Sequence, residues 1–346
     1  MQHEITTPVD LLDKKGHLIE EGWARRPLWR YERTQIHASS WNIKEWEYYA
    51  VINQKAGYGM TATMSDMGYC AMFAIAYIDF DRGSGVQTNA FVPFSFGKLG
   101  FLANSSLDQD LSWANKTIRL AFITRKEKRH LLFACPSLIL PDGHTGLDCD
   151  LTLDQPEALQ SMNIATSWKE KRTAFYLNQK INCMAASGTI RRGPDVEHLC
   201  KDEAWGVLDW GRGRWTYQNR WFWGSASGLL EGVRFGFNIG YGFSDRTPAS
   251  ENVLFYDGII HKLDEVTFEV PRDSYMKPWK FTSNDHRFEM DFEPRFDRAS
   301  SLNALVLKSR QHQVFGYFSG NVVLDDGRTL EVKKFPGFVE DVFNRW

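Results

Sequence analysis

The chain has 346 residues, of which 14% are aromatic, and its formal net charge is −2 at pH 7. On a prior of roughly 150 residues per domain, this length predicts about two domains, each able to bury its own core. A net charge this close to zero provides no basic field for phosphate backbones or anionic lipid, so nucleic acid is not an expected partner.

Simple patterns argue against several other classes of protein. The longest apolar run, Ala71–Ile78, is far shorter than the roughly 20 residues that span a bilayer. The N-terminal residues lack the charged-then-apolar order of a signal peptide. The five cysteines are odd in number and show no CxxC spacing, which argues against a disulfide framework or a zinc site. We therefore expect a cytoplasmic protein with reduced thiols, no membrane span, no metal and no cofactor.

Alternation of apolar and polar residues recurs along the chain, whereas helical periodicity is scarce. Strands are predicted over Glu45–Asn53, Cys70–Phe80, Asn89–Phe96, Lys116–Thr124, His130–Cys135, Ala174–Met184, Val253–Tyr256 and Thr267–Val270. A short helix is expected at Asp195–Ala204. Near the C-terminus, Asp325-Asp-Gly-Arg328 predicts a hairpin, because glycine accepts the positive φ that such turns require.

The clearest strand runs from Gly232 to Phe243. Its apolar face comprises Val233, Phe235, Phe237, Ile239, Tyr241 and Phe243, and its other face comprises Gly232, Arg234, Gly236, Asn238, Gly240 and Gly242. Repeated glycines on one face allow another backbone or a ligand to approach closely, or allow the sharp bend that barrels need.

Many antiparallel strands with few helices predict an all-β fold of sandwiches or barrels. The polar stretch Ser187–Glu203, which contains proline and glycine, is the expected break between two domains. We therefore expect domains over residues 1–200 and 201–346, with the boundary inside the interval 185–250.

The segment Asp209–Trp223 concentrates tryptophan and arginine more than any other part of the chain: Trp210, Trp215, Trp221 and Trp223 alternate with Arg212, Arg214 and Arg220. In one interpretation the tryptophans line an apolar pocket, and Asp209, Arg212, Arg214, Asn219 and Asn238 orient a ligand. In the other, Arg212 or Arg214 stacks on Trp215 or Trp221 and pairs with Asp209, which locks a structural corner. The second interpretation is favoured, although both can hold together.

A second group of residues lies at Lys44–Tyr49. On a strand, Lys44, Trp46 and Tyr48 share one face, and Glu45, Glu47 and Tyr49 share the other. At least one charge would then point inward and need a partner, for which an arginine of the Asp209–Trp223 segment is a hypothesis. A salt-bridged surface strand is the favoured alternative.

Several of these motifs resemble those of the DUF2804 family of uncharacterised proteins over nearly the whole chain. They are Lys44-Glu-Trp-Glu-Tyr-Tyr49, Asp66-Met-Gly-Tyr69, Leu208-Asp-Trp-Gly-Arg-Gly-Arg-Trp215, Trp221-Phe-Trp223, Asn238-Ile-Gly-Tyr-Gly242 and Gly337-Phe-Val-Glu340. More distantly, the order of motifs is similar to that of AttH-like and carotenoid-hydratase-like proteins. That resemblance implies few short helices and two lipocalin-like antiparallel β-barrels packed together. In those relatives a His-acid pair follows the Trp-hydrophobic-Asp motif, whereas here Gly211-Arg212-Gly213 takes its place.

Three functions are compatible with these observations, since fold alone does not fix function. The favoured one is the binding of an apolar or lipid-like small molecule in a barrel pocket. The expected ligand-binding residues are Trp210, Arg212, Arg214, Trp215, Asn219, Trp221, Trp223, Asn238, Tyr241, Trp46 and Tyr48.

The second is a cofactor-independent hydratase, cyclase or isomerase acting on an isoprenoid or polyene. It would need a desolvated carboxylic acid with a raised pKa, for which Asp209 is the best candidate. The third is a structural or carbohydrate-contacting module, which predicts Trp221 and Trp223 exposed on a flat sheet. The sequence predicts no oligomeric state.

Overall fold

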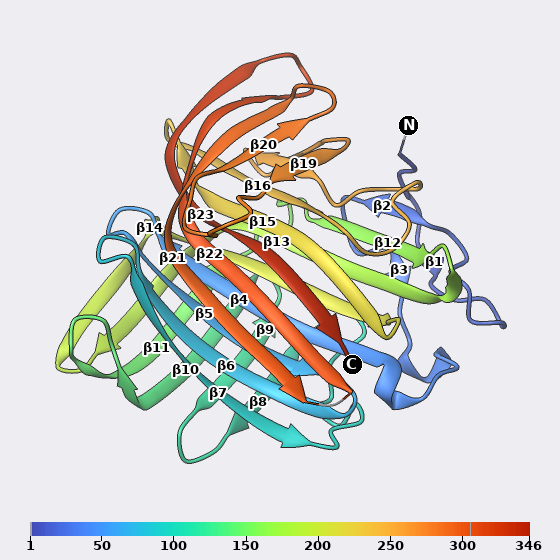
Figure 1. Cartoon of the computed structure of the whole chain (residues 1–346), viewed down its shortest axis with the longest axis horizontal. Helices are drawn as coiled ribbons and strands as arrows, with labels where there is room; N and C mark the ends of the chain where they lie inside the picture. Colours follow the sequence, from blue (N-terminus) through green and yellow to red (C-terminus); the bar gives the residue numbers. More distant parts are fainter. Residues whose placement is uncertain (1, 305) are drawn as a thin grey trace.

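The computed structural model describes residues 2–304 and 306–346, and almost all of its regular structure is antiparallel β-strand (Figure 1). Two short 3₁₀ helices occur in the described residues, η1 (Arg33–Gln35) and η2 (Ser40–Asn42). The prediction of an all-β fold with few short helices is therefore confirmed. No helix in the described part of the chain is long and apolar enough to cross a membrane.

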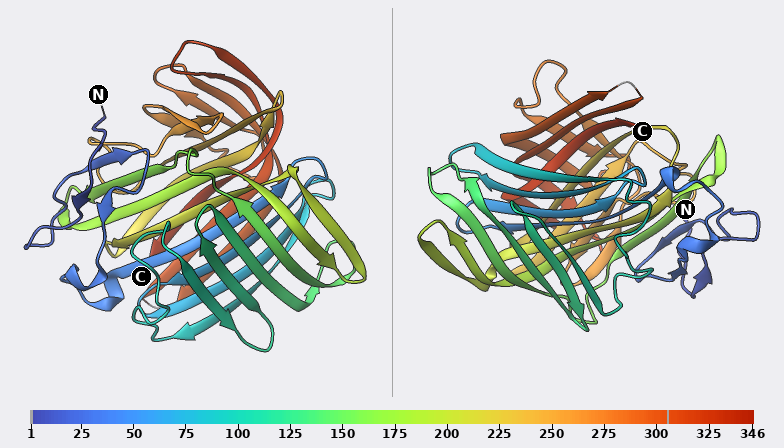
Figure 2. Two further views of the ribbon diagram at one scale, coloured as in Figure 1. Left: turned by 180° about the vertical axis from the view of Figure 1, so that it is seen from behind. Right: turned by 90° about the horizontal axis from the view of Figure 1, so that it is seen from below.

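The first large sheet contains twelve strands. They are β2 (Gly22–Ala24), β4 (Ile43–Asn53), β5 (Tyr58–Asp66), β6 (Cys70–Asp79), β7 (Ser84–Pro93), β8 (Gln109–Ala114), β9 (Arg119–Arg125), β10 (Lys128–Ile139), β11 (Thr145–Asp154), β12 (Met162–Trp168), β13 (Lys171–Arg192) and β14 (Asp195–Arg214). The strand order is β7-β6-β5-β4-β14-β13-β11-β10-β9-β8, and β12 and β2 extend from the other half of β13. Strand β7 also contacts β10, so the sheet curls back on itself (Figures 1 and 2).

The second large sheet contains nine strands in the order β18-β17-β16-β15-β23-β22-β21-β20-β19. They are β15 (Gln218–Leu230), β16 (Val233–Tyr241), β17 (Val253–Tyr256), β18 (Ile259–Lys262), β19 (Val266–Glu269), β20 (Trp279–Ser283), β21 (Phe288–Ala304), β22 (Leu307–Val323) and β23 (Thr329–Arg345). This sheet is also curved, since β19 contacts β16. A small parallel pair, β1 (Val9–Asp10) with β3 (Trp29–Arg30), lies apart from both sheets.

Two local predictions are confirmed. Strand β16 occupies most of the predicted Gly232–Phe243 strand, and its apolar side chains are buried in the core of the second sheet. A Cβ at Gly236 would lie 2.5 Å from the carbonyl oxygen of Ala226, which is the close backbone approach that the glycine pattern indicates. The Asp325–Arg328 turn joins β22 to β23, with Gly327 at a φ of +84°.

The short helix predicted at Asp195–Ala204 is wrong, because these residues form the first half of β14. A turn at Gly193, with a φ of +56°, folds the chain back so that Asp195 pairs with Arg192 and His198 with Thr189. Ser187–Glu203 is therefore part of a hairpin within the first sheet. The chain passes to the second sheet between Arg214 and Gln218, inside the interval 185–250. The division into two domains stays a prediction.

Each curled sheet encloses its own apolar core, and a third layer of apolar side chains lies between the sheets. In Figures 1 and 2, β4 to β6 of the first sheet lie beside β21 to β23 of the second. The buried contacts of this layer come from both sheets: Tyr48, Ile52, Ile78, Phe80 and Val207 from the first, and Trp223, Phe315 and Phe338 from the second.

A buried amide connects the two sheets at a bulge in β13. The register of β13 with β14 shifts between Ile181 and Met184, where Cys183 adopts a φ of +61°. This directs the fully buried Asn182 toward β15 and β16. Its Nδ2 lies 2.9 Å from Ser225 Oγ and 3.2 Å from Ser227 Oγ and the carbonyl oxygens of Ala226 and Phe237.

Asn182→Ala should lower the free energy of unfolding by about 1–3 kcal/mol, because the change leaves buried oxygens of the second sheet without their donor. Denaturant titration followed by far-UV circular dichroism measures this loss. Asn303→Ala, at an exposed position of β21, is the matched control and should change stability by less than about 0.5 kcal/mol. Equal effects of the two substitutions would show that Asn182 does not hold the sheets together.

Candidate functional site

A cavity of about 160 Å³ lies between the two sheets. This volume resembles that of an engineered apolar cavity of about 150 Å³ that binds benzene. Thirteen of the lining side chains are polar or charged, and eight are aromatic: Trp46, Tyr48, Tyr176, Trp215, Trp221, Trp223, Phe243 and Trp346. The acidic and basic side chains of the cavity wall are Lys44, Lys180, Asp209, Glu251, Arg298 and Glu340. The interiors of the curled sheets are filled by their own cores, so this cavity differs in place from the expected barrel pocket.

The structure brings about half of the predicted site residues to this cavity. Those that line it are Asp209, Trp215, Trp221, Trp223, Trp46 and Tyr48. The others lie elsewhere: Trp210, Arg212, Arg214, Asn219, Asn238 and Tyr241. For Trp210, Arg212, Arg214 and Tyr241 the cause is the pleat of the strands, because successive side chains point to opposite faces of a sheet. Asn219 and Asn238 are on the same strand faces as Trp221 and Trp223 but do not line the cavity.

The alternation is clearest on β14. Asp209 faces the cavity, whereas Trp210 and Arg212 point into the interior of the first sheet. Position 211 faces the cavity side again, and a Cβ there would lie 2.0 Å from Trp46 Cζ2. Gly211 therefore lets the indole of Trp46 lie flat against the strand and form part of the cavity wall.

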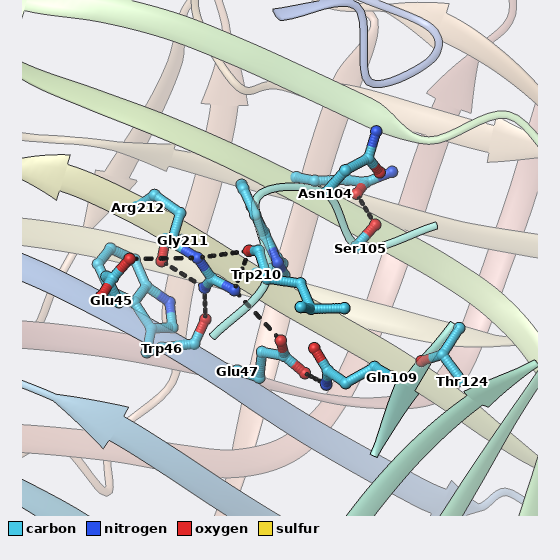
Figure 3. Close-up of polar contacts among 12 residues, drawn as sticks. Glu45, Trp46, Glu47, Asn104, Ser105, Gln109, Thr124, Trp210, Gly211 and Arg212 are labelled. Carbon is cyan, nitrogen blue, oxygen red and sulfur yellow. Dashed lines mark hydrogen bonds and ion pairs between the residues drawn. The ribbon is translucent and has the colours of Figure 1, made fainter. Parts of the chain in front are cut away.

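Arg212 is fully buried in a polar cluster inside the first sheet (Figure 3). Its Nη2 lies 3.3 Å from Glu47 Oε1, and its Nη1 donates to the carbonyl oxygens of Trp46 and Gly211 at 2.9 Å. The guanidinium stacks 4.0 Å from the ring centroid of Trp210. Gln109 Nε2 donates to the other oxygen of Glu47 at 3.0 Å.

This cluster decides between the alternatives left open for both groups of residues. Arg212 does stack on an indole and pair with a carboxylate, but both predicted partners are wrong: the ring is that of Trp210, not Trp215 or Trp221, and the acid is Glu47, not Asp209. The hypothesis that an inward charge at Lys44–Tyr49 pairs with an arginine of the Asp209–Trp223 segment is confirmed. The favoured alternative of a surface strand is wrong, because Lys44, Glu45 and Glu47 are each 1% exposed.

Three other predicted residues do not line the cavity. One of them binds an indole of the cavity wall, and the other two contact residues outside it. Asn238 Oδ1 accepts a hydrogen bond from Trp223 Nε1 at 2.7 Å, which fixes the orientation of that indole in the wall. Asn219 Oδ1 accepts from Trp168 Nε1 at 3.1 Å. Tyr241 packs against Phe222 and Phe268 on the opposite face of the second sheet.

Asp209, the predicted best candidate for an acid, lies in a buried ion pair. Its Oδ1 is 2.9 Å from Lys180 Nζ and accepts from Asn178 Nδ2 at 2.6 Å. Lys180 Nζ also lies 4.0 Å from the ring centroid of Trp223 and 3.9 Å from Glu251 Oε2. Burial raises the pKa of Glu251, and the nearby Lys180 opposes that shift.

Glu340 is a cavity carboxyl group that the residue patterns did not single out. Its Oε1 accepts from Gln313 Nε2 at 2.5 Å and its Oε2 from Trp221 Nε1 at 3.4 Å. Burial raises its pKa to about 7, and Arg298 only partly offsets this effect. One signal was available, because Phe338, Glu340 and Val342 alternate on one face of β23, which marks an acid on an otherwise apolar face.

The family model described as "Domain of unknown function (DUF2804)" matches residues 2–346. The chain belongs to the DUF2804 family. A search of curated proteins finds no match.

Solved structures share the fold of this DUF2804 protein at low sequence identity. An AttH-like protein of Nitrosomonas europaea is 12% identical with a TM-score of 0.55, and the match covers 90% of this chain and 95% of that one. CghA in complex with Sch210972 is 12% identical with a TM-score of 0.53, and the match covers 87% of each chain. These neighbours are lipocalin-like, which confirms the expected fold class.

One further ionisable group of the DUF2804 protein lies at the cavity wall. Lys44 Nζ donates to the carbonyl oxygens of Trp41 and Met67 at 2.8 and 2.6 Å. It also lies 4.6 Å from the ring centroid of Tyr69 and 5.0 Å from that of Trp346. Burial lowers its pKa to about 7, because the desolvated ammonium is disfavoured.

Arg212→Ala should destabilise the protein by about 3–5 kcal/mol, because it leaves the Glu47 carboxylate buried without its cation. Equilibrium unfolding in guanidinium chloride measures the change. The control is Arg214→Ala: Arg214 is half-buried and donates to the carbonyl oxygen of His37 at 3.2 Å, so its loss should cost less than about 1 kcal/mol. Similar losses for both variants would contradict the structural role assigned to Arg212.

Proposed function

We propose that this DUF2804 protein binds an apolar small molecule with an aromatic or unsaturated skeleton in the cavity between its two sheets. The observation that carries the proposal is a wall in which indole rings from both sheets surround a space of about 160 Å³. Ligand sites are typically apolar concave pockets with a few convergent polar groups. Lys180, Asp209 and Glu340 supply such polar groups here.

The arrangement of the tryptophans favours this function over carbohydrate contact. A sugar-stacking platform needs broad indole faces open to solvent, but Trp223 is only 4% exposed and Trp221 is half-buried. The fold comparison adds support, since one solved structure that shares this fold is the crystal structure of CghA with Sch210972.

The polar groups of the wall also restrict the ligand. Lys44, Lys180 and Arg298 face the same space as Asp209, Glu251 and Glu340. The formal charges of these residues balance when all are ionised, and also when Lys44 and Glu340, each with a pKa of about 7, are both neutral. A ligand with a full charge would have to give up its hydration without a matching excess of opposite charge. A neutral ligand is therefore the best fit.

Saturable binding of the neutral fluorescent probe N-phenyl-1-naphthylamine is the expected result, with quenching of tryptophan fluorescence. Trp221→Ala should raise Kd about tenfold, equivalent to about 1.4 kcal/mol, because the ring loses its stacking partner. Trp113→Ala removes an equally half-buried indole that stacks on Phe73 outside the cavity, and it should leave Kd unchanged.

Far-UV circular dichroism of both variants shows whether each remains folded. Unsaturable binding to the wild type, or the same weakening in both folded variants, would contradict a ligand site in this cavity. Native mass spectrometry of the freshly purified protein, before and after organic extraction, reports any co-purified molecule.

A further inference from the structure

Three carboxyl groups face the cavity, and their partners differ. Asp209 Oδ1 is paired with Lys180 at 2.9 Å, and Glu251 Oε2 lies 3.9 Å from the same ammonium group. Within the described residues, no lysine or arginine lies within ion-pair distance of Glu340. Its hydrogen-bond donors are the neutral amide of Gln313 and the neutral indole of Trp221.

The charged and titratable groups that surround Glu340 come from four strands. Arg298 on β21 donates to Thr61 Oγ1 at 3.1 Å, and its charge is the main influence that opposes the raised pKa of Glu340. Lys180 on β13 and Asp209 on β14 form their own pair. Tyr48 on β4 accepts a hydrogen bond from Gln313, the same amide that donates to Glu340. Glu340 is therefore the cavity acid with the weakest electrostatic support for its anion.

We infer that Glu340 is the proton donor of this cavity, and that the molecule bound there carries a carbon–carbon double bond that accepts the proton. The inference rests on the proposed function, because it requires an unsaturated ligand in the cavity. It differs from the sequence-based expectation for Asp209, whose oxygen already accepts from a lysine and an asparagine.

The step is balanced without any cofactor. The O–H bond of the Glu340 carboxylic acid breaks, and the π electrons of the alkene form a new C–H bond to the proton. The neighbouring carbon becomes a cation, and the electron pair of the O–H bond stays on the carboxylate. The carboxylate then removes a proton from the carbon on the other side of the cation. A new double bond forms there, the acid is restored, and the net reaction is an isomerisation.

The cavity wall is suited to the two species that this step requires, the protonated acid and the carbocation. Indole faces stabilise a nearby cation through their quadrupole, and the effect is larger when the site is desolvated. Trp223 already holds the ammonium of Lys180 at 4.0 Å from its ring centroid, which shows that this face accepts a cation. The pKa of Glu340, raised to about 7 by burial, keeps a large fraction of the acid protonated at neutral pH.

Styrene oxide tests the inference without knowledge of the natural ligand. A protonated carboxyl group donates its proton to the epoxide oxygen, a ring C–O bond breaks, and the carboxylate oxygen attacks the benzylic carbon. The products are an ester and a hydroxyl group, so the protein gains the full mass of the epoxide. Peptide mapping by mass spectrometry should place this ester on Glu340, with Asp209 and Glu251 unmodified.

The labelling rate should be constant below about pH 7 and fall about tenfold per pH unit above it, as the protonated fraction falls. Glu340→Gln should abolish ester formation at position 340, and far-UV circular dichroism shows whether the variant remains folded. If that variant does not fold, the site of labelling and the pH profile of the wild type still decide the matter. An ester on Asp209 or Glu251, or no labelling of a protein that binds the probe, would overturn the role of Glu340. Failure to bind the probe at all would instead overturn the proposed function.

Discussion

Burial of β4 and β14 on both faces is the constraint on which this structure depends. These strands pair from Ile43 with Arg214 to Asn53 with Ala204, and nearly every residue along the pairing is buried. Because side chains alternate, one set must fill the interior of the first sheet and the other must meet the second sheet. Charged residues on these strands then have no route to solvent, so each must find a partner inside the protein.

The two faces satisfy this requirement differently. In the interior, Arg212 is matched to Glu47 and to several carbonyl oxygens, and the space is closed by Trp210 and the surrounding core. On the face toward the second sheet, Lys180 is paired with Asp209, and the indoles of Trp215, Trp221 and Trp223 line the cavity. Space for a ligand therefore exists at the junction of the sheets, where two independently curved surfaces meet.

Sequence patterns predicted the parts of the fold that depend on local alternation, such as β16 and the Asp325–Arg328 hairpin. They failed at Asp195–Ala204, where the polar composition of an exposed half-strand resembled a solvated helix and pairing with β13 decided the conformation. For the site, alternation alone could have separated Asp209 from Trp210 and Arg212 once β14 was recognised as a strand. Alternation on β23 could mark Glu340 as an acid on an apolar face, but it could not show that Glu340 faces this cavity, because the indole that donates to it is 119 residues away in the chain.

The Gly211-Arg212-Gly213 sequence limits where an acid can lie in this cavity. Position 211 is closed to any side chain, because the ring of Trp46 occupies the space that a Cβ would need. Arg212 points away from the cavity and is committed to Glu47. These three residues thus place no acid at the cavity, and Asp209 of the same strand is paired with Lys180. The acid that remains unpaired comes from β23, directly across the register from Trp223 of the same segment. Trp221 and Trp223 of the aromatic wall and the proposed proton donor are therefore supplied by neighbouring strands of the second sheet, so substitution of Glu340 on β23 should alter the chemistry and substitution of Trp221 on β15 the affinity.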